Sequence, residues 1–246
     1  MAIHDSTSQR LFVDAELRPG AVFDATDEQF NYLVRVLRMG AGDAVLVFNG
    51  RDGEWQAKLS DIAKRTCRLV VDAQTRGQTV GPDVTFMFAP LKRARIDYLV
   101  QKAVELGARH LAPVITRRTI AERVNLERMR ANAIEAAEQC GILHVASIAE
   151  PQRFEQVIGA WASERHLIFC DEAAPISDPI AALAPLRTMP VTVLIGPEGG
   201  FDPIERDAIR ALPNATALSL GPRIMRADTA AVAALTLVNA VIGDWR

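Results

Sequence analysis

The sequence has little cysteine and little histidine, and neither residue type is grouped. Its three cysteines, Cys67, Cys140 and Cys170, lie far apart, without the paired spacing that zinc sites and disulfide frameworks use. The four histidines are equally scattered, whereas a metal ion needs donors that are clustered or helically spaced. We therefore expect no metal site, no disulfide framework and a reducing, cytoplasmic compartment.

Long apolar runs are also absent. The most weakly polar stretch, residues 229–242, is rich in alanine and contains Thr236 and Asn239. It is shorter than the ~18 apolar residues expected of a membrane span. The first six residues have neither the basic start nor the apolar centre of a secretory signal. We expect no membrane partner.

Two familiar phosphate-binding motifs are missing as well. The sequence contains neither the strict dinucleotide fingerprint nor the phosphate-binding loop that ends in Gly-Lys-Ser or Gly-Lys-Thr. Their absence disfavours a nucleotide-dependent enzyme, so a glycine-rich turn in this chain must bind its ligand in another way.

Apolar residues make up 49% of the 246 residues and charged residues 24%, a composition typical of a soluble globular protein with a sizeable core. The net charge is -2, but its distribution is uneven. Residues 76–130 carry 11 Lys/Arg against 5 Asp/Glu, whereas residues 131–246 carry 8 against 14. The middle of this weakly acidic chain is therefore basic enough to contact phosphate.

Strand signals separated by turn formers dominate the first 75 residues. The expected strands are residues 10–13, 21–23, 44–48, 54–60 and 66–72. One expected helix, residues 27–37, interrupts them, and Gly, Pro, Asn and Asp fill the turns. Short strands at this spacing around a single helix predict a small β-barrel domain over residues 1–75.

A polar segment with glycine, residues 76–82, is expected to link this domain to a second one, residues 83–246. In the second domain, strands and helices are expected to alternate. The strands expected there are residues 84–89, 110–115, 145–148, 166–170, 191–195 and 215–220. The expected helices are residues 93–106, 125–140, 153–163, 179–183, 203–212 and 229–242. This alternation predicts an α/β fold, a mostly parallel sheet with helices on both faces.

One glycine-rich turn follows the expected strand at residues 191–195, in the sequence Ile-Gly-Pro-Glu-Gly-Gly-Phe. Its glycines remove side chains where a ligand could approach the backbone, as happens at the carboxyl edge of a parallel sheet. Asp202 and Glu205 have the spacing of a capping box for the next helix. Because a tight strand-to-helix connection would use the same residues, this turn alone leaves a structural and a binding role open.

A second turn, residues 219–229, reads Ser-Leu-Gly-Pro-Arg-Ile-Met-Arg-Ala-Asp-Thr. Arg223 and Arg226 precede a helix whose first turn already favours anions, so their charge does not serve the helix dipole. Two arginines at this position indicate contact with a phosphate or a substrate base. Asp228 or Thr229 is expected to cap the helix.

Basic side chains gather after two neighbouring strands of the expected sheet. Lys92, Arg93 and Arg95 follow the first of these strands. Arg118 follows the second, and Lys102 lies on the intervening helix. If the sheet is parallel, these clusters share an edge with the two glycine-rich turns, which favours a nucleic acid as the partner.

The last expected helix, residues 229–242, carries alanine, valine and leucine almost all round. A helix that is apolar on every face is normally buried on every face. Either the core surrounds it or another subunit covers part of it, and we favour the second arrangement.

Several segments together resemble a known family. The matching segments are residues 10–13, 35–39, 42–43, 101–102, 105–107, 138–141, 195–200, 220–226 and 228–230, with Pro113 and Arg118. On these residues the chain resembles the ribosomal RNA small-subunit uridine N3-methyltransferases of the RsmE type, in the SPOUT class of S-adenosylmethionine-dependent enzymes. The segments in the two glycine-rich turns are the specific ones.

The resemblance implies a PUA-like RNA-binding barrel followed by a SPOUT methyltransferase domain whose C-terminal part forms a deep trefoil knot. It implies S-adenosylmethionine as the cofactor, 16S ribosomal RNA of the small subunit as the substrate, and a homodimer with the site near the subunit boundary. The reaction would transfer a methyl group to N3 of one uridine.

The resemblance also implies roles for individual residues. The cofactor-binding residues are Ile195, Gly196, Pro197, Glu198, Gly199, Gly200, Ser219, Leu220, Gly221, Ile224, Met225 and Ala230. The RNA-binding residues are Arg10, Arg35, Arg38, Lys92, Arg93, Arg95, Lys102 and Arg118. The catalytic residues are Arg226, Asp228 and Arg223.

We expect Arg226 to stabilise the negative charge that develops on the uracil, with Arg223 and Asp228 holding the loop or the base. No histidine or lysine stands out as a general base, so the proton acceptor stays open. The chain departs from the family pattern with Asn31 and Tyr32 in place of a common His. Further departures are Ile142 in place of a common Arg and Asp228 in place of Glu.

Two other functions remain open at this point. One is a SPOUT enzyme that acts on a ribose 2′-oxygen or a transfer-RNA base. The other is a non-catalytic RNA-binding protein that uses the barrel and the basic edge.

Overall fold

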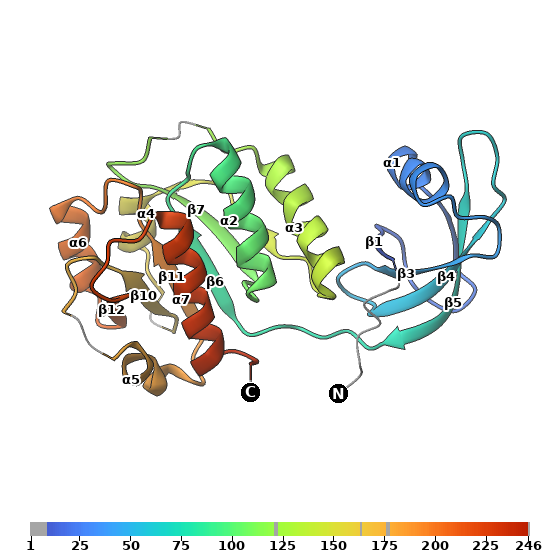
Figure 1. Cartoon of the computed structure of the whole chain (residues 1–246). Helices are drawn as coiled ribbons and strands as arrows, with labels where there is room; N and C mark the ends of the chain where they lie inside the picture. The colour runs from blue at the N-terminus through green and yellow to red at the C-terminus, as the bar shows by residue number, and fades with distance from the viewer. Residues whose placement is uncertain (1–8, 121–122, 163, 176–177, 246) are drawn as a thin grey trace. The chain divides into compact units, whose positions relative to one another are not determined.

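The structure, a computed structural model, describes residues 9–120, 123–162, 164–175 and 178–245, and of Arg93 it describes the backbone only. The chain divides into two compact units, whose elements Figure 1 labels. Unit 1 contains the residues up to position 80 together with Ala137–Val145. Unit 2 contains residues 81–136 and those from 146 onwards.

Unit 1 is built on a five-stranded sheet with the order β1-β3-β4-β5-β2. Its strands are β1 (Arg10–Phe12), β2 (Val22–Asp24), β3 (Ala44–Phe48), β4 (Glu54–Ser60) and β5 (Arg68–Arg76). β1 pairs with β3 in parallel, and the other neighbours are antiparallel. The register of β4 against β5 shifts around Trp55, which bends the sheet. All five predicted strands are present, and β5 extends into the segment expected to be a linker.

Alternation along the strands builds the core of unit 1. Val45 and Val47 of β3 and Ala57 and Leu59 of β4 are buried, whereas the residues between them are more exposed. These side chains share one apolar cluster with Leu33, which comes from the helical segment of the unit. One face of the curled sheet is therefore closed by that segment.

The helix predicted at residues 27–37 is two different helices. α1 (Asp27–Phe30) starts with a capping box between Thr26 and Gln29 and passes into the π-helix η1 (Asn31–Val36). The wider winding is visible in the hydrogen bond from Leu37 N to Tyr32 O, which spans five residues at 2.9 Å. Over so short a stretch, the spacing of apolar residues does not separate a π-helix from an α-helix.

A buried charge network joins β1, β4 and β5. Arg10 Nε donates to Glu54 Oε2 at 2.8 Å, and Arg76 Nη2 donates to the same oxygen at 2.6 Å. Burial by itself would raise the pKa of Glu54, but hydrogen bonds from Arg76 and Arg10 outweigh it and lower the pKa to about 2. Arg10 is only 8% exposed, and its guanidinium group is engaged within unit 1, whereas the RNA contact expected for it stays a prediction.

The same arginines hold Ala137–Val145 in unit 1. Arg10 and Arg76 donate to backbone carbonyls of this segment over distances from 2.8 Å to 3.3 Å. Phe48 forms an apolar cluster with side chains of the segment, and Ile142 packs against that cluster. The departure from the family pattern at Ile142 therefore adds apolar contact to unit 1.

Unit 2 contains a parallel sheet with the order β12-β10-β11-β6-β7-β8, and the short β9 also pairs with β7. Its strands are β6 (Val84–Phe88), β7 (His110–Ile115), β8 (Ser147–Ile148), β9 (Gln152–Arg153), β10 (His166–Cys170), β11 (Val191–Ile195) and β12 (Ala215–Leu218). Its helices are α2 (Arg93–Glu105), α3 (Leu126–Cys140, which ends in unit 1), α4 (Phe154–Gly159), α5 (Pro179–Leu183), the 3-10 helix η2 (Ala184–Leu186), α6 (Pro203–Arg210) and α7 (Ala227–Val241). The predicted α/β fold is confirmed.

Helices cover both faces of this sheet. α7 packs on α2 and on β11, whereas α4 packs on α6 and β7, and α6 packs on β12 (Figure 1). Phe169 of β10 and Leu194 of β11 share a cluster with Phe154 of α4. Successive strand residues alternate between faces, so Cys170 and Ile195, the last residues of their strands, lie on the face that α7 covers.

The predicted capping box of α6 is confirmed. Asp202 Oδ1 accepts from Ile204 N at 3.1 Å, and Glu205 Oε2 accepts from Asp202 N at 3.0 Å. Other boundaries differ from the prediction, since α4 ends at Gly159 and β12 ends at Leu218.

The predicted cap of the last helix is wrong. Arg226 is the last extended residue before α7, with φ -66° and ψ 152°, and it makes no side-chain capping hydrogen bond. Asp228 and Thr229 therefore already lie in the first turn, and Asp228 Oδ1 accepts from Thr229 N at 2.9 Å. An acidic side chain in this position still favours the helix dipole.

Burial of α7 is confined to one side in the single chain. Ala234, Leu235 and Val238 are buried, whereas Thr229 and Ala240 are exposed. The other side of this apolar helix therefore remains open. Among the helices of the described residues, none has both the length and the apolar character that crossing a membrane requires.

We predict that Glu54→Ala lowers the free energy of unfolding by about 3–5 kcal/mol at pH 7, because it leaves the buried guanidinium group of Arg10 and the partly buried one of Arg76 without their carboxylate. The folded pKa of Glu54 lies below its ordinary value of 4.5, so its stabilisation is complete above that value. The stabilisation disappears as the pH falls toward about 2. Urea unfolding at several pH values would show the difference between wild type and variant shrinking in this window.

Glu16→Ala is the matched control, because Glu16 is exposed and its contact to Arg18 is 3.5 Å long. We expect it to change the free energy of unfolding by no more than about 0.5 kcal/mol at any pH. Equal effects of the two substitutions would contradict the structural importance of the network.

Candidate functional site

Three loops start from neighbouring strand ends in unit 2. β12, β10 and β11 are adjacent and parallel, so the chain leaves all three at one edge of the sheet. Two cavities adjoin there, one of about 590 Å³ along the turn after β11 and one of about 120 Å³ along the turn after β12. Residues that line both cavities are Cys170, Glu172, Ile224, Met225 and Ala230. The structure thus brings together the two glycine-rich turns.

The first turn, residues 195–201, is closed so tightly that two of its positions exclude side chains. A Cβ atom on Gly196 would lie 2.9 Å from the Phe201 ring, which is itself buried. Gly200 has φ +68°, and a Cβ atom there would lie 2.7 Å from Glu172 Oε1. Gly200 N donates to the Pro197 carbonyl at 2.9 Å, which closes the turn. Three glycines of this turn, Gly196, Gly199 and Gly200, line the larger cavity.

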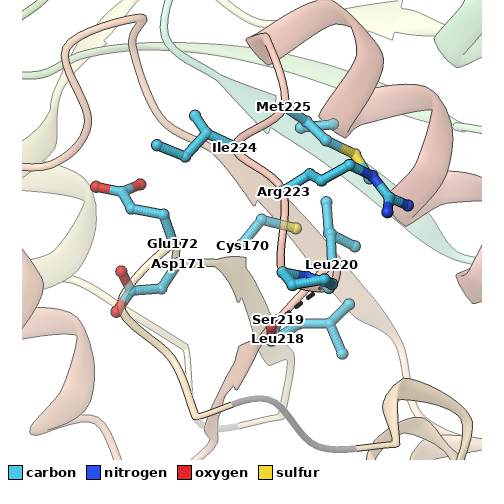
Figure 2. A pocket seen from close by; sticks show the side chains of 12 residues that line it. Cys170, Asp171, Glu172, Leu218, Ser219, Leu220, Arg223, Ile224 and Met225 are labelled. Atoms are coloured by element: carbon cyan, nitrogen blue, oxygen red, sulfur yellow. Dashed lines mark hydrogen bonds between the residues drawn. The ribbon is translucent and has the colours of Figure 1, made fainter.

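The second turn, residues 219–226, is anchored at its start and open at its tip. Ser219 is buried, and its Oγ accepts from Gly221 N at 3.3 Å (Figure 2). Gly221 has φ +99°, a conformation that side chains disfavour. Ile224 is 91% exposed, although it is a large apolar residue at the boundary of both cavities. Its exposure leaves apolar surface beside the cavities for a ligand to cover.

Two guanidinium groups stand on this second turn. Arg223 lines the smaller cavity and Arg226 the larger one. Neither has an ion-pair partner among the described residues. Figure 2 shows the Arg223 side chain pointing away from Glu172. Asp228 is the third residue expected in catalysis. It is not among the described residues that line the two cavities, and its Oδ1 accepts a hydrogen bond from Thr229 N.

The loop after β10 supplies cavity residues that the sequence analysis missed. The side chain of Asp171 is fully buried and pairs with Arg206 at 3.1 Å and with Arg210 at 2.8 Å, which fixes the loop to α6. Burial raises the pKa of the Cys170 thiol to about 12, so this group is neutral and a poor nucleophile. The signal that could have located this loop is the end of the predicted strand at residues 166–170.

Glu172 lines both cavities, and Figure 2 shows its carboxylate at the smaller one. Its side chain is 53% exposed, and Oε1 accepts from Arg206 Nη2 at 3.1 Å. One of its carboxylate oxygens lies against Gly200, so the position of Glu172 depends on the absence of a side chain in the first turn.

Three of the basic residues predicted for this edge lie around the first turn. Arg95 forms an ion pair with Glu198, and Arg118 Nη1 donates to the carbonyl of Gly199 at 2.9 Å. Lys92 is exposed and lines a small cavity with Arg118 and Glu198. The predicted convergence of these strand ends with the first turn is therefore observed.

The other basic residues of the prediction lie elsewhere. Lys102 pairs with Glu105 at 2.6 Å within α2. Arg35 and Arg38 are exposed in unit 1. The side chain of Arg93 lies outside the described residues. Within the described ranges, no group of three or more His, Cys, Asp or Glu residues is placed to hold a metal ion.

Comparison with protein families identifies the class of the chain. Residues 79–239 match the model of the RNA methyltransferase domain, and residues 25–72 match that of the RNA methyltransferase PUA domain. The first match covers most of the chain, so fold and site define an RNA methyltransferase with a PUA domain ahead of it.

Relatives give the family within this class. A ribosomal RNA small subunit methyltransferase E from Synechocystis is 31% identical over 237 residues, which cover 95% of this chain and 78% of the relative. One from Rickettsia conorii is 28% identical over 232 residues, which cover 94% of both chains. The chain belongs to the ribosomal RNA small subunit methyltransferase E family.

Solved structures agree with this fold. A methyltransferase from Legionella pneumophila, in complex with S-adenosylmethionine, has a TM-score of 0.85 and 27% identity, and the match covers 96% of this chain and 99% of that chain. A ribosomal RNA small subunit methyltransferase E from Neisseria gonorrhoeae has a TM-score of 0.86 and 24% identity, with 97% and 100% covered. The SPOUT-type α/β domain and the PUA-like barrel are therefore the architecture of this chain.

We predict that Gly196→Ala lowers the free energy of unfolding by about 1–3 kcal/mol, because the new methyl group must displace the buried ring of Phe201. Gly159→Ala is the control in the same unit, since a Cβ atom at Gly159 meets nothing within 4 Å. It should leave stability unchanged or raise it by up to about 1 kcal/mol, because Gly159 ends a helix. Denaturant unfolding of both variants measures the difference, and a fully stable Gly196→Ala would contradict the described turn.

Proposed function

We propose that this chain is an S-adenosylmethionine-dependent methyltransferase that modifies N3 of a uridine in the 16S ribosomal RNA of the small subunit. The observation that carries the proposal is the pair of adjoining cavities with open backbone on one side and two unpaired guanidinium groups on the other. Membership of the family supports the substrate class. The Legionella pneumophila structure supports the cofactor, since that protein binds S-adenosylmethionine.

The residues of the two turns fit this cofactor. A cavity of about 590 Å³ lies within the ~300–1,000 Å³ range of small-molecule sites. Gly196 and Gly200 line this cavity, and Ile195, Met225 and Ala230 supply apolar surface. When bound, the cofactor supplies an electrophilic methyl group on its sulfonium centre. The open glycine backbone would hold the adenosine and methionine parts in place.

The chain itself would contribute to the reaction by stabilising negative charge on the uracil and by holding the RNA in position. Arg226, at the boundary of the larger cavity, would stabilise the negative charge on a uracil that loses its N3 proton. Arg223, on the same turn, would hold the RNA phosphate or the base. Neither cavity is lined by a described histidine or lysine, so we assign no side chain as the general base. Asp228 would act through the loop at the start of α7 and not by touching the base.

We further propose that the enzyme works as a homodimer in the cytoplasm, with the open side of α7 covered by the second subunit. The open side carries small residues such as Ala233 and Ala240, which permit close helix packing. The start of the same helix borders the larger cavity through Ala227 and Ala230. This arrangement would put the methyl-transfer site close to the subunit boundary.

The proposal is tested on small ribosomal subunits from a strain that lacks the enzyme. The purified chain with S-adenosylmethionine should methylate one uridine at N3, and mass-spectrometric mapping would identify the nucleotide. Methylation of a ribose 2′-oxygen or of transfer RNA instead would overturn the assigned target. Absence of S-adenosylmethionine binding in calorimetry, with and without RNA, would favour a non-catalytic RNA-binding protein.

We predict that Arg226→Ala lowers the turnover number by about 10²–10³-fold, the usual effect of losing one group that stabilises developing charge. Binding of S-adenosylmethionine should stay within about threefold, because the cavity retains its glycine backbone. Arg187→Ala, which removes an exposed cation from the same unit, should leave turnover unchanged. Single-turnover methylation and calorimetry separate the two steps, and full activity of Arg226→Ala would refute its role.

A further inference from the structure

One ion pair at the larger cavity joins the first turn to α2. Glu198 of the turn lines this cavity and pairs with Arg95, which lies near the start of α2. The proposed function leaves the acceptor of the uracil N3 proton open, because no described histidine or lysine lines the two cavities. We propose that the Glu198 carboxylate accepts this proton once a phosphate of the RNA has taken Arg95 from it. The inference rests on the proposed function, which supplies a uridine in RNA as the substrate.

Two described carboxylates line the larger cavity, and their partners differ. Glu172 accepts from Arg206 Nη2 at 3.1 Å, and Arg206 also pairs with the fully buried Asp171, so Glu172 is tied to α6. The side chain of Arg206 is only 19% exposed, whereas that of Arg95 is 40% exposed. A ligand that arrives from water therefore reaches the partner of Glu198 more easily than the partner of Glu172.

The ion pair between Arg95 and Glu198 can be exchanged for another. The Glu198 side chain is 39% exposed, and water screens a pair with this much exposure, so the attraction is weak. A phosphate can bind the guanidinium group of Arg95 through two hydrogen bonds at once, which makes it a strong competitor. An RNA phosphate that binds Arg95 would therefore release the Glu198 carboxylate.

Further cations would attract an RNA phosphate to this place. Glu198 also borders the small cavity that Lys92 and Arg118 line, and both of these cations are exposed. In the larger cavity Glu198 is accompanied by Arg226, the group expected to stabilise negative charge on the uracil. Glu198 thus borders both the cations that would hold the RNA and the cavity in which the base would react.

The backbone on both sides of Glu198 is fixed, so the carboxylate can change partners by rotation of its own side chain. Gly200 N donates to the Pro197 carbonyl at 2.9 Å, and Arg118 Nη1 donates to the Gly199 carbonyl at 2.9 Å. The cofactor contact that the resemblance implies for Glu198 would be made by this backbone. The carboxylate would then be left for the proton.

The charged groups that share a cavity with Glu198 are mostly cationic. They are Lys92, Arg95, Arg118, Arg226 and Glu172. A glutamate is ordinarily ionised at pH 7, so it can take up a proton without first losing one.

In the proposed step, the N3–H bond of the uracil breaks and the proton joins an oxygen of Glu198. The electron pair of N3 forms a bond to the methyl carbon. The bond between that carbon and sulfur breaks, and its electron pair stays on the sulfur, which loses its positive charge. Arg226 stabilises the negative charge on the uracil during the step. Glu198 ends the step neutral and passes its proton to water.

The first test is Glu198→Gln in the full chain, which keeps the shape of the side chain but removes the proton acceptor. We expect the single-turnover rate of methylation of small ribosomal subunits to fall about 10²–10⁴-fold, the usual contribution of a general base. Calorimetric affinity for S-adenosylmethionine should change little, because the backbone of the turn is unaltered. Glu150→Gln, which changes an exposed glutamate of the same unit, is the matched control and should leave the rate unchanged.

The pH profile separates a proton acceptor from a structural residue. The wild-type rate should vary little between about pH 6 and pH 9, because an ordinary glutamate is ionised throughout this range. In Glu198→Gln the proton must leave to hydroxide, so the rate should rise about tenfold per pH unit. Glu172→Gln should keep the flat profile of the wild type, whatever its rate. Parallel profiles of wild type and Glu198→Gln would overturn the proposal.

A small carboxylate should replace the missing one. In Glu198→Ala, added formate should raise the rate in proportion to its concentration, whereas chloride at the same ionic strength should not. If formate and chloride act alike, Glu198 is not the proton acceptor.

Arg95→Gln tests the exchange of partners. It should raise KM for the subunits and make the slope of log affinity against log salt concentration shallower by about 0.7–0.9, since one phosphate contact is lost. Its turnover number should fall far less than that of Glu198→Gln. Both variants break the same ion pair, so equal losses of turnover and thermal stability would mean that the pair only stabilises the turn, which contradicts the proposal.

Failure of this inference can be told from failure of the proposed function. If the wild type methylates no uridine of ribosomal RNA, the proposed function fails and the inference fails with it. If the wild type methylates N3 and Glu198→Gln keeps the wild-type rate, the function stands and the role of Glu198 is refuted. Thermal unfolding of each variant ensures that the comparison is made on folded protein.

Discussion

The parallel pairing of β10 with β11 on one side and β12 on the other is the constraint on which the site depends. Because neighbouring parallel strands end at the same edge, three loops far apart in the sequence must meet there. The loop after β10 brings Glu172, the loop after β11 brings open glycine backbone, and the loop after β12 brings two arginines. If one of these strands were antiparallel, its loop would lie at the opposite edge of the sheet.

This edge of the sheet combines glycine positions that cannot carry a side chain with arginine positions that carry positive charge. Gly196 and Gly200 sit where a Cβ atom would collide with Phe201 or Glu172, so the turn keeps its shape only with glycine. Arg223 and Arg226 sit where no described acidic group neutralises them. The region thus combines a tightly closed glycine turn with positive charge that no described acidic group compensates, which suits an anionic ligand.

The sequence predicts the regular parts of this molecule well, because local rules govern them. The Asp202–Glu205 capping box and the strand ending at Ile195 follow from residue type and spacing. The buried role of Arg10 depends on Glu54 and on residues more than a hundred positions away, so no local pattern reveals it. Local signals also misplaced the cap of α7. They missed Glu172 as well, because only the folded chain brings it to the cavities. The trefoil knot and the roles of the site residues stay predictions.

Because Ala137–Val145 belongs to unit 1, the barrel is not a module confined to the first 80 residues. This segment is encoded inside the methyltransferase half of the gene, yet its apolar side chains complete a cluster around Phe48. A fragment that stops at residue 80 would expose that apolar surface to water and leave Arg10 without its carbonyl partners. Recombination that exchanges only the first 80 residues between relatives would therefore break a shared core, so the two halves must change in sequence together.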